Sequence, residues 1–165
     1  MASSVLNSIA DEVAETINAA VEDETISETL TAARVKRPRF ELGVTDSLSV
    51  QVYPASIRKE RIGRNDWQVD YGIGLAVVKA VTQDSQLTPS EIDGDDATES
   101  DDVDLLVEQL TGLFEASPVL ADTDATLISV RYHSDASDPD APYSGTVLST
   151  EHIHAANVVM TFRGA

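Results

Sequence analysis

The spacing of the apolar residues changes three times along the chain, and this order of spacings limits the folds that the chain can adopt. Apolar residues recur at every fourth position from Val5 to Val21, which is typical of an amphipathic helix. Apolar and polar residues then alternate over residues 48–53 and 69–77, as they do in strands that bury one face. The helical spacing and then the alternation return over residues 103–114, 127–133 and 153–163.

Helices and strands in this order, without a regular alternation of one strand and one helix, predict an α+β fold. We expect a single, mostly antiparallel or mixed sheet of four to five strands, with two helices packed on it and long protruding loops. The length of 165 residues fits a single domain. The expected segments are an N-terminal helix (1–21), a linker (22–39), strands with a basic hairpin (40–81), an acidic loop (82–100), a second helix (101–117) and two C-terminal strands (125–163) joined by a loop (134–150).

Local signals place the ends of several of these elements. Ser3 or Ser4 is the expected N-cap of the first helix. An acidic run begins at Glu22, and the helix should end before it because the helix dipole disfavours negative charge at the C-terminus. Pro54 is expected to end the first alternating run, and Pro118 is expected to end the second helix.

Some residues within the expected strands also carry information. Gly72 and Gly74 fall on one face of an alternating run, where they leave room for close packing or for a bulge. Residues 55–66 form either a wide hairpin tip or an extra edge strand. One side of the strand over 127–133 should hold Ile128, Val130 and Tyr132.

Charge is divided unevenly along the chain, whose net charge is −18. Eight of its 11 basic residues lie between Arg34 and Arg64, whereas 26 of its 29 acidic residues lie outside that stretch. A basic stretch in an acidic protein predicts a surface that meets a negatively charged partner, and another copy of the same chain is such a partner.

Three interpretations of the basic stretch are open: a nucleic-acid surface, a solvated hairpin and a contact between subunits. Nucleic acid is disfavoured because the chain is strongly acidic and the stretch has few aromatic residues on which bases could stack. A contact between subunits is favoured, because acidic residues of a neighbouring copy, such as those in 91–104, would pair with the bases in a ring. The candidate interface residues are Arg58, Lys59, Arg61, Arg64, Asp95, Asp96, Asp101 and Tyr143.

The choice among charged residue types indicates a protein that works in concentrated salt. The chain has 17 Asp against 12 Glu, and three Lys against eight Arg. A large net charge makes a protein repel itself, and about 1 M salt mutes this repulsion by reducing the screening length to about 3 Å. The alternative is a protein of ordinary surroundings with acidic loops.

Two groups of residues suggest metal ligands, and for both we favour a solvated surface. His152 and His154 share one face of an expected strand, with His133 on the next strand, but no carboxylate has ligand spacing beside them. Two acidic runs do not match the spacing and the glycine position of an EF-hand loop; they are Asp93, Asp95, Asp96 and Asp135, Asp138, Asp140.

No motif predicts an enzyme or a cofactor. The chain has no cysteine, which excludes disulfides, thiolate metal sites and thiol nucleophiles. Gly72 and Gly74 form a G-x-G within an alternating run, which is not a phosphate-binding loop, and no G-x-S-x-G is present. We also expect neither a signal peptide nor a membrane span, because no apolar run is long enough.

Several segments together resemble the tail terminators of tailed viruses, the neck proteins that cap the tail tube and join it to the head. The resemblance covers most of the chain, and its segments are the helix "SIADEVAETINAAV", the strand "LSVQVYP", the hairpin and strand "DWQVDYGIGLAVVKAV", the helix "DDVDLLVEQLTGLFEA" and the strands "LISVRYHS" and "HIHAANVVMTFRGA". The strong acidity and the long segment 82–100 depart from the family pattern, and they suggest a virus of a salt-loving host.

The resemblance implies a structural protein of the virion that is assembled in the host cytoplasm. Its partners would be further copies of itself in a hexameric ring, the tail-tube protein and a head-completion or stopper protein. It implies no catalytic residue, no cofactor, no sequence-specific nucleic acid and no membrane. Another connector or tail-tube subunit, and an acidic cellular binding module, are the alternatives.

Overall fold

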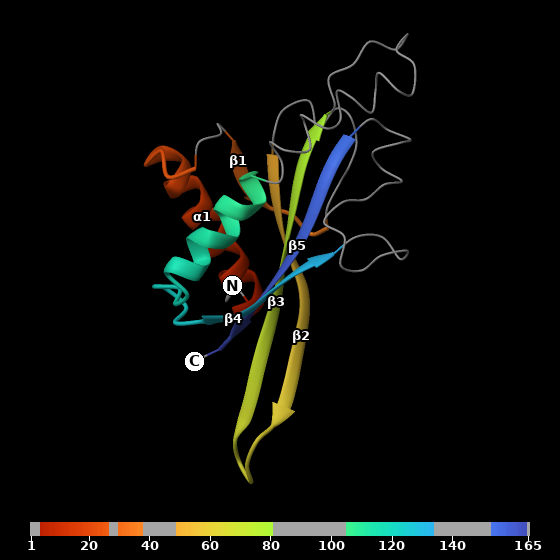
Figure 1. Ribbon diagram of the computed structural model, residues 1–165. Helices are drawn as coiled ribbons and strands as arrows, with labels where there is room; N and C mark the ends of the chain where they lie inside the picture. The colour runs from red at the N-terminus through yellow and green to blue at the C-terminus, as the bar shows by residue number, and fades with distance from the viewer. Residues whose placement is uncertain (1–3, 27–29, 38–48, 81–104, 134–152, 165) are drawn as a thin grey trace.

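The computed structural model describes residues 4–26, 30–37, 49–80, 105–133 and 153–164 (Figure 1). They form two helices and a single mixed sheet of five strands, which confirms the predicted α+β fold class. The elements in chain order are α1 (Val5–Glu22), β1 (Thr31–Arg34), β2 (Ser49–Arg61), β3 (Trp67–Ala80), the second helix (105–116), β4 (Thr126–His133) and β5 (Ile153–Arg163).

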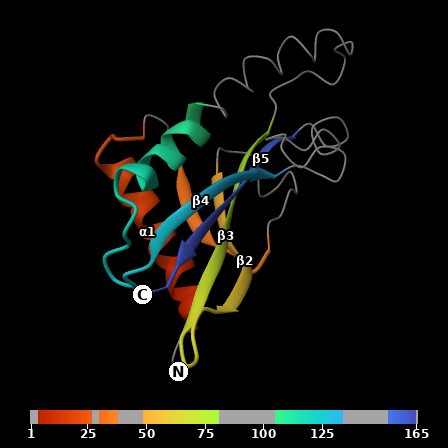
Figure 2. The same ribbon diagram turned by 60° about the horizontal axis from the view of Figure 1, so that its bottom comes forward.

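The strands lie in the order β1-β2-β3-β5-β4 (Figure 1, Figure 2). β1 and β2 are parallel, and every other neighbouring pair is antiparallel. The sheet is therefore mixed, with β1 at one edge and β4 at the other.

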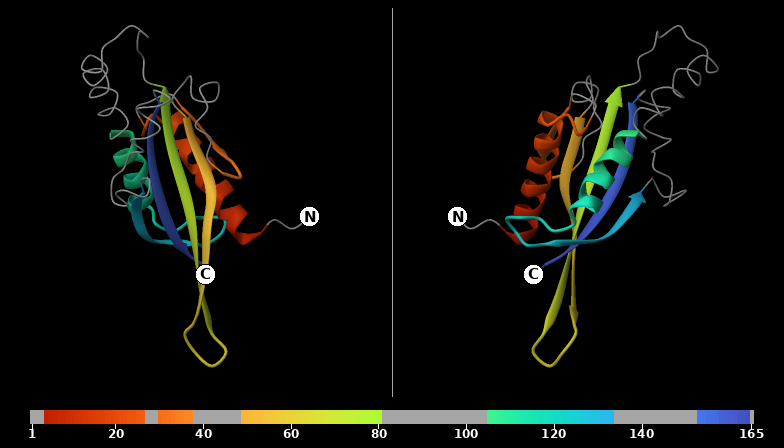
Figure 3. Two further views of the ribbon diagram at one scale, coloured as in Figure 1. Left: turned by 90° about the vertical axis from the view of Figure 1, so that its right-hand side faces the viewer. Right: turned by 60° about the vertical axis from the view of Figure 1, so that its left-hand side comes forward.

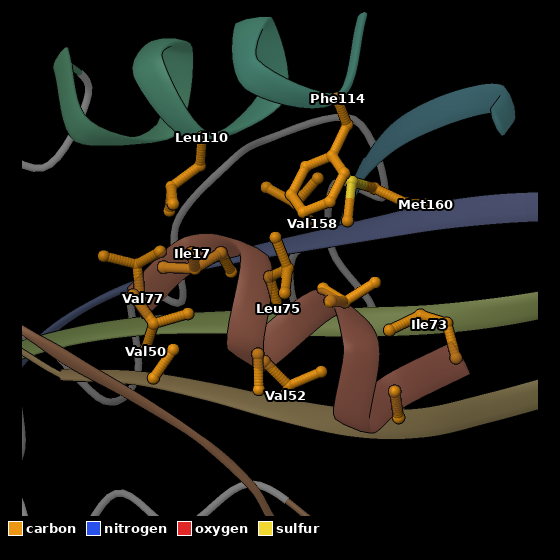
Figure 4. Packing of buried hydrophobic residues seen from close by; sticks show 14 of the residues in the cluster. Ile17, Val50, Val52, Ile73, Leu75, Val77, Leu110, Phe114, Val158 and Met160 are labelled. Carbon is orange, nitrogen blue, oxygen red and sulfur yellow. The ribbon is translucent and has the colours of Figure 1, made fainter. Parts of the chain in front are cut away.

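Both helices cover the same face of the sheet, as the two opposed views in Figure 3 show. The alternating residues of the central strands bury their side chains under the helices; they are Val50, Val52, Ile73, Leu75, Val77, Val158, Met160 and Phe162. The helices contribute residues at helical spacing to the same cluster, among them Ile9, Val13 and Leu106. Ile17, Leu110 and Phe114 of this cluster are labelled in Figure 4. Phe114 meets Phe162 edge to face, with ring centroids 6.2 Å apart.

α1 begins as the sequence predicts and ends one residue later. The Ser4 side chain accepts a hydrogen bond from the Asn7 backbone N–H at 3.2 Å, which makes Ser4 the N-cap. The helix includes Glu22, the first residue of the acidic run, and Glu24 then takes a positive φ of 58°. The side chain of Glu22 is exposed, so solvent screens its unfavourable interaction with the helix dipole.

The segment expected as a linker contains the strand β1, which the sequence prediction missed. β1 has four residues and buries only Ala32. The Asn18 side chain of α1 bonds to both backbone groups of Ala32: its Nδ2 donates to the carbonyl oxygen at 2.9 Å, and its Oδ1 accepts from the N–H at 2.8 Å. This long-range pairing, together with the ladder to β2, makes a strand from a segment with almost no apolar pattern.

Pro54 does not end its strand, contrary to the sequence prediction. β2 continues through Pro54 to Arg61, with a register shift between Pro54 and Ser56. β1 pairs only with residues 49–52 of β2, so Pro54 lies where one side of β2 has no neighbouring strand among the described residues. A proline is tolerated at such an edge because no partner needs its missing N–H.

One face of β4 also differs from the prediction. Ile128 is 42% exposed, whereas Leu127 and Val130 pack against the core. The cause is a register shift between Leu127 and Ser129, which interrupts the alternation of the side chains.

Candidate functional site

The β2–β3 hairpin extends beyond the rest of the sheet as a two-stranded arm, at the bottom of Figure 1. β5 pairs with β3 only from Asp70 onward, and β1 pairs with β2 only over residues 49–52. We call residues 57–71 the arm. Most of it has no neighbouring strand in the described part of the chain, so its side chains reach solvent on both faces.

The first face of the arm continues the side of the sheet that the helices cover, and we call it the helix-side face. Opposite one another across the two strands lie Ile57 and Tyr71, then Lys59 and Val69, then Arg61 and Trp67. Tyr71 packs against the edge of the core, which fixes the side to which this face belongs. Alternation then places Val69 and Trp67 on the same side, farther from the body.

Large apolar side chains are exposed on this face and at the tip. Trp67 is 62% exposed, Ile57 is 51% exposed, and Ile62 at the tip is 64% exposed. Together with Lys59 and Arg61, Ile57 and Trp67 give the helix-side face an apolar and cationic surface, whereas the acids of the arm are Asp66 at the tip and Glu60 and Asp70 on the other face.

The second face, which we call the paired face, has a different chemistry. Arg163 of β5 binds Asp70 through two bonds, Nε to Oδ1 at 2.9 Å and Nη2 to Oδ2 at 3.4 Å. Arg58 lies opposite Asp70 and reaches Glu60, with 3.6 Å between Nη2 and Oε2. Two cations and two carboxylates thus balance on this face. The Arg163 guanidinium, which is the main cause, lowers the pKa of Asp70 below its usual range.

The tip of the arm is held by its own backbone and by Arg61. The N–H groups of Ile62 and Gly63 donate to the Asp66 carbonyl oxygen at 3.0 and 3.3 Å. The Arg61 guanidinium donates to the carbonyl oxygens of Gly63, at 2.9 Å, and of Arg64. Arg61 therefore orders the turn.

The structure brings four of the eight predicted interface residues together on the arm, namely Arg58, Lys59, Arg61 and Arg64. They are not equivalent, because Arg58 is paired with Glu60 and Arg61 holds the turn. Within the described residues, the side chains of Lys59 and Arg64 make no hydrogen bond or ion pair. The other four, Asp95, Asp96, Asp101 and Tyr143, lie outside the described residues, as do the segments 82–100 and 134–150.

Sequence reasoning found the charges of the arm but missed its apolar residues. The missed residues are Ile57 and Trp67. For Trp67 the available signal was period two, because Trp67, Val69 and Tyr71 alternate with polar residues. Ile57 is a single apolar residue between Ser56 and Arg58, and ending the strand at Pro54 left it without an assigned face.

A second feature, near the start of α1, is an acidic hollow of about 480 Å³. Its lining residues are Val5, Ser8, Asp11, Glu12, Glu15, Asp122 and Thr123. The Glu12 carboxylate is buried in it and accepts bonds from the backbone N–H groups of Asp122 and Thr123, at 2.8 and 3.1 Å, and from the Thr123 hydroxyl at 2.7 Å. Glu12 thus joins α1 to the turn before β4, which is a structural role.

The backbone register places His133 and His154 opposite different residues. His133 lies opposite Asn157, and His154 lies opposite Lys79 on the other side of β5. His152 and the Asp-rich runs lie outside the described residues. Within the residues that the structure describes, no three acidic or histidine side chains gather as a possible metal site.

Two further findings bear on the classification of the protein. In the described ranges, no helix has the length and apolar character needed to cross a membrane. The sequence matches no family model and no curated protein.

Proposed function

We propose that this protein is a structural subunit of a tailed-virus neck, forming a ring that caps the tail tube and joins it to the head-completion proteins. The observation that supports this proposal is the arm: a hairpin with exposed apolar and basic side chains that projects from the α+β body of a chain whose net charge is −18. A projecting element of one sign on a chain of the other sign suits head-to-tail contact between copies, and such contacts form a ring when the rotation between neighbours closes the circle.

The bonding of the polar side chains in the described residues also supports an assembly role. Glu12 and Asn18 are engaged in bonds that hold the fold together, and Asp70 is paired with Arg163. The largest apolar side chains of the arm, Ile57, Ile62 and Trp67, are by contrast more than half exposed in a single chain. Exposed apolar residues gathered on one element favour a binding surface.

Native mass spectrometry of the purified chain in low and high salt tests the proposal. We expect a discrete closed ring, a hexamer by the resemblance, that binds to the end of isolated tail tubes. Long stacked cylinders would favour a tail-tube subunit instead. A strict monomer at every salt and protein concentration, without binding to tubes, would contradict the proposal and favour a cellular binding module.

A matched pair of variants tests the contribution of the arm charges. Lys59→Ser with Arg64→Ser removes the two cations that have no partner in the described chain, and it leaves the Arg61 bonds that order the tip. We expect weaker or slower ring formation in low salt, because exposed charges act mainly on association. Lys36→Ser with Arg37→Ser, two exposed bases near β1, is the control for net charge.

A further inference from the structure

We infer that the arm docks on a second copy of this chain through its helix-side face, with Trp67 and Ile57 as the anchoring side chains and the paired face left in solvent. The inference rests on the proposed function and adds to it the contact residues, the orientation of the arm and the source of the affinity.

The contrast between the two faces gives the orientation. The paired face carries Arg58, Glu60, Asp70 and Arg163, whose charges balance within one chain. The helix-side face carries Lys59 and Arg61 with no acid, and its apolar side chains are half-exposed or more at Ile57 and Trp67. The face with unbalanced charge and exposed apolar surface is the one that gains by binding.

Charge complementarity identifies the occupant as a second copy. The arm, residues 57–71, contains four bases and three acids, a net charge of +1, so the remaining residues of a chain at −18 carry −19. Outside its own arm, every other copy therefore carries a net charge opposite to that of the arm. Two arms carry net charge of the same sign, which disfavours face-to-face pairing of arms and favours contact of an arm with the rest of a neighbouring copy.

The apolar anchors supply the affinity, and the charges supply the orientation. A buried aromatic side chain contributes roughly 150–250 Å², a sizeable part of the roughly 800 Å² that each partner buries in a standard interface. Trp is also enriched among the residues on which binding depends most. Salt at about 1 M reduces the screening length to about 3 Å, so the contact should persist in salt that weakens its charge pairs.

The first experiment uses the unaltered protein, because Trp67 is the only tryptophan in the chain. Its fluorescence reports on the arm alone. We expect the emission to shift to shorter wavelength, and quenching by acrylamide to fall at least twofold, as protein concentration rises through the range in which sedimentation velocity detects the ring.

The second experiment compares two double variants that alter adjacent residues of the same two strands on opposite faces. Ile57→Ser with Trp67→Ser changes the helix-side face, and Arg58→Ser with Gln68→Ser changes the paired face. We expect the first pair to raise the concentration for half-assembly at least tenfold, in both 0.15 M and 2 M NaCl. The second pair should change it less than twofold.

Circular dichroism and thermal melts of each monomer establish that the variants are folded. If the first pair does not fold, Trp67→Gln alone replaces it, since this side chain is mostly in solvent. Tryptophan emission that stays unshifted while a ring forms overturns the face assignment. So does a paired-face variant that weakens assembly as much as the helix-side variant does. Either result leaves the ring proposal standing.

Other binding partners give distinct outcomes. A protein that stays monomeric at every salt and concentration overturns both the ring and the docking contact. An emission shift that appears only with vesicles of one-third phosphatidylglycerol, or only with duplex DNA, also overturns the inference, because the occupant is then a lipid surface or a nucleic acid.

Discussion

Tyr53 lies on the sheet face opposite the helices and limits the size of the residue at position 74. Its hydroxyl donates to the Asn157 Oδ1 at 2.9 Å, and its ring occupies the place where a Cβ at Gly74 would be. Burial raises the pKa of Tyr53, and the bond to Asn157 opposes this rise. Gly74 is therefore needed for close packing, which is one of the two roles that its place in the sequence allows.

Replacing Gly74 by Ala should destabilise the protein by about 1–3 kcal/mol, because the new methyl group overlaps the Tyr53 ring. Gly112→Ala is the matched control: nothing lies within 4 Å of a Cβ there, and the residue is inside the second helix. We expect that control to stabilise by roughly 0.5–1 kcal/mol. Urea unfolding measures both, and a neutral Gly74→Ala would show that the ring can move aside.

The Asp70–Arg163 pair makes stability depend on acid pH. Arg163 lowers the pKa of Asp70 in the folded chain, so the stabilisation is present above the unfolded pKa of about 3.9 and is lost as pH falls through the lower, folded value. Asp70→Asn should thus lower the free energy of unfolding at pH 6 and differ less from the parent at pH 2.5. Urea unfolding at the two pH values checks this, and a difference that grows in acid would contradict it.

At the scale of elements, the sequence predicts those that carry enough apolar side chains to set their own period. α1, the second helix, β3 and β5 were predicted within a few residues for this reason. β1 could not be predicted, since it depends on bonds from Asn18, which lies 14 residues from Ala32 in the sequence. The outer half of β2 was missed because the sequence alone does not show that Pro54 lies at a sheet edge, and a proline elsewhere in a sheet would end the strand.

The second helix offers adjacent leucines with opposite environments. Leu106 is fully buried and Leu105 is 49% exposed. Leu106→Ala should lower the free energy of unfolding by about 2–5 kcal/mol, whereas Leu105→Ala should change it by no more than about 0.5 kcal/mol. Similar losses in both variants, measured by chemical unfolding, would mean that the helix faces the sheet differently.

The edge of the sheet at β1 depends on the Asn18 side chain, which pairs both backbone groups of Ala32 as a neighbouring strand would. Asn18→Ala should cost about 1–3 kcal/mol, because the partly buried groups lose their partner. It should also expose an edge to which other strands can add. Hydrogen exchange at Ala32 measures the loss of protection, and an unchanged rate would show that the amide is not needed. Asn7→Ala in the same helix is the control.

At the scale of the whole molecule, the distribution of charge along the chain was predictable from the sequence. The projecting arm that carries the basic residues was not. The basic residues could be counted, but their division into paired, turn-forming and unpartnered side chains follows from the register of β2 with β3. Half of the predicted interface residues lie outside the described ranges, so the acidic side of the expected contact remains a prediction.

A net charge of −18 should make stability rise with salt. The screening length falls from about 30 Å at 0.01 M to about 3 Å at 1 M, so most of the self-repulsion disappears over that interval. We expect the melting temperature of the Ile57→Ser with Trp67→Ser variant to rise through this range; using this variant removes the contribution of assembly. A melting temperature that is independent of NaCl would contradict a role of charge repulsion.

The register shift between Pro54 and Ser56 has a geometric consequence for assembly. It lies where β2 leaves the body, and an irregularity of this kind bends a strand and increases its twist. In a ring closed by arms, the direction in which each arm leaves its body determines the rotation between neighbours, and hence how many subunits complete the circle. The number of subunits in the ring would then be encoded at the root of the arm, away from the residues that make the contact.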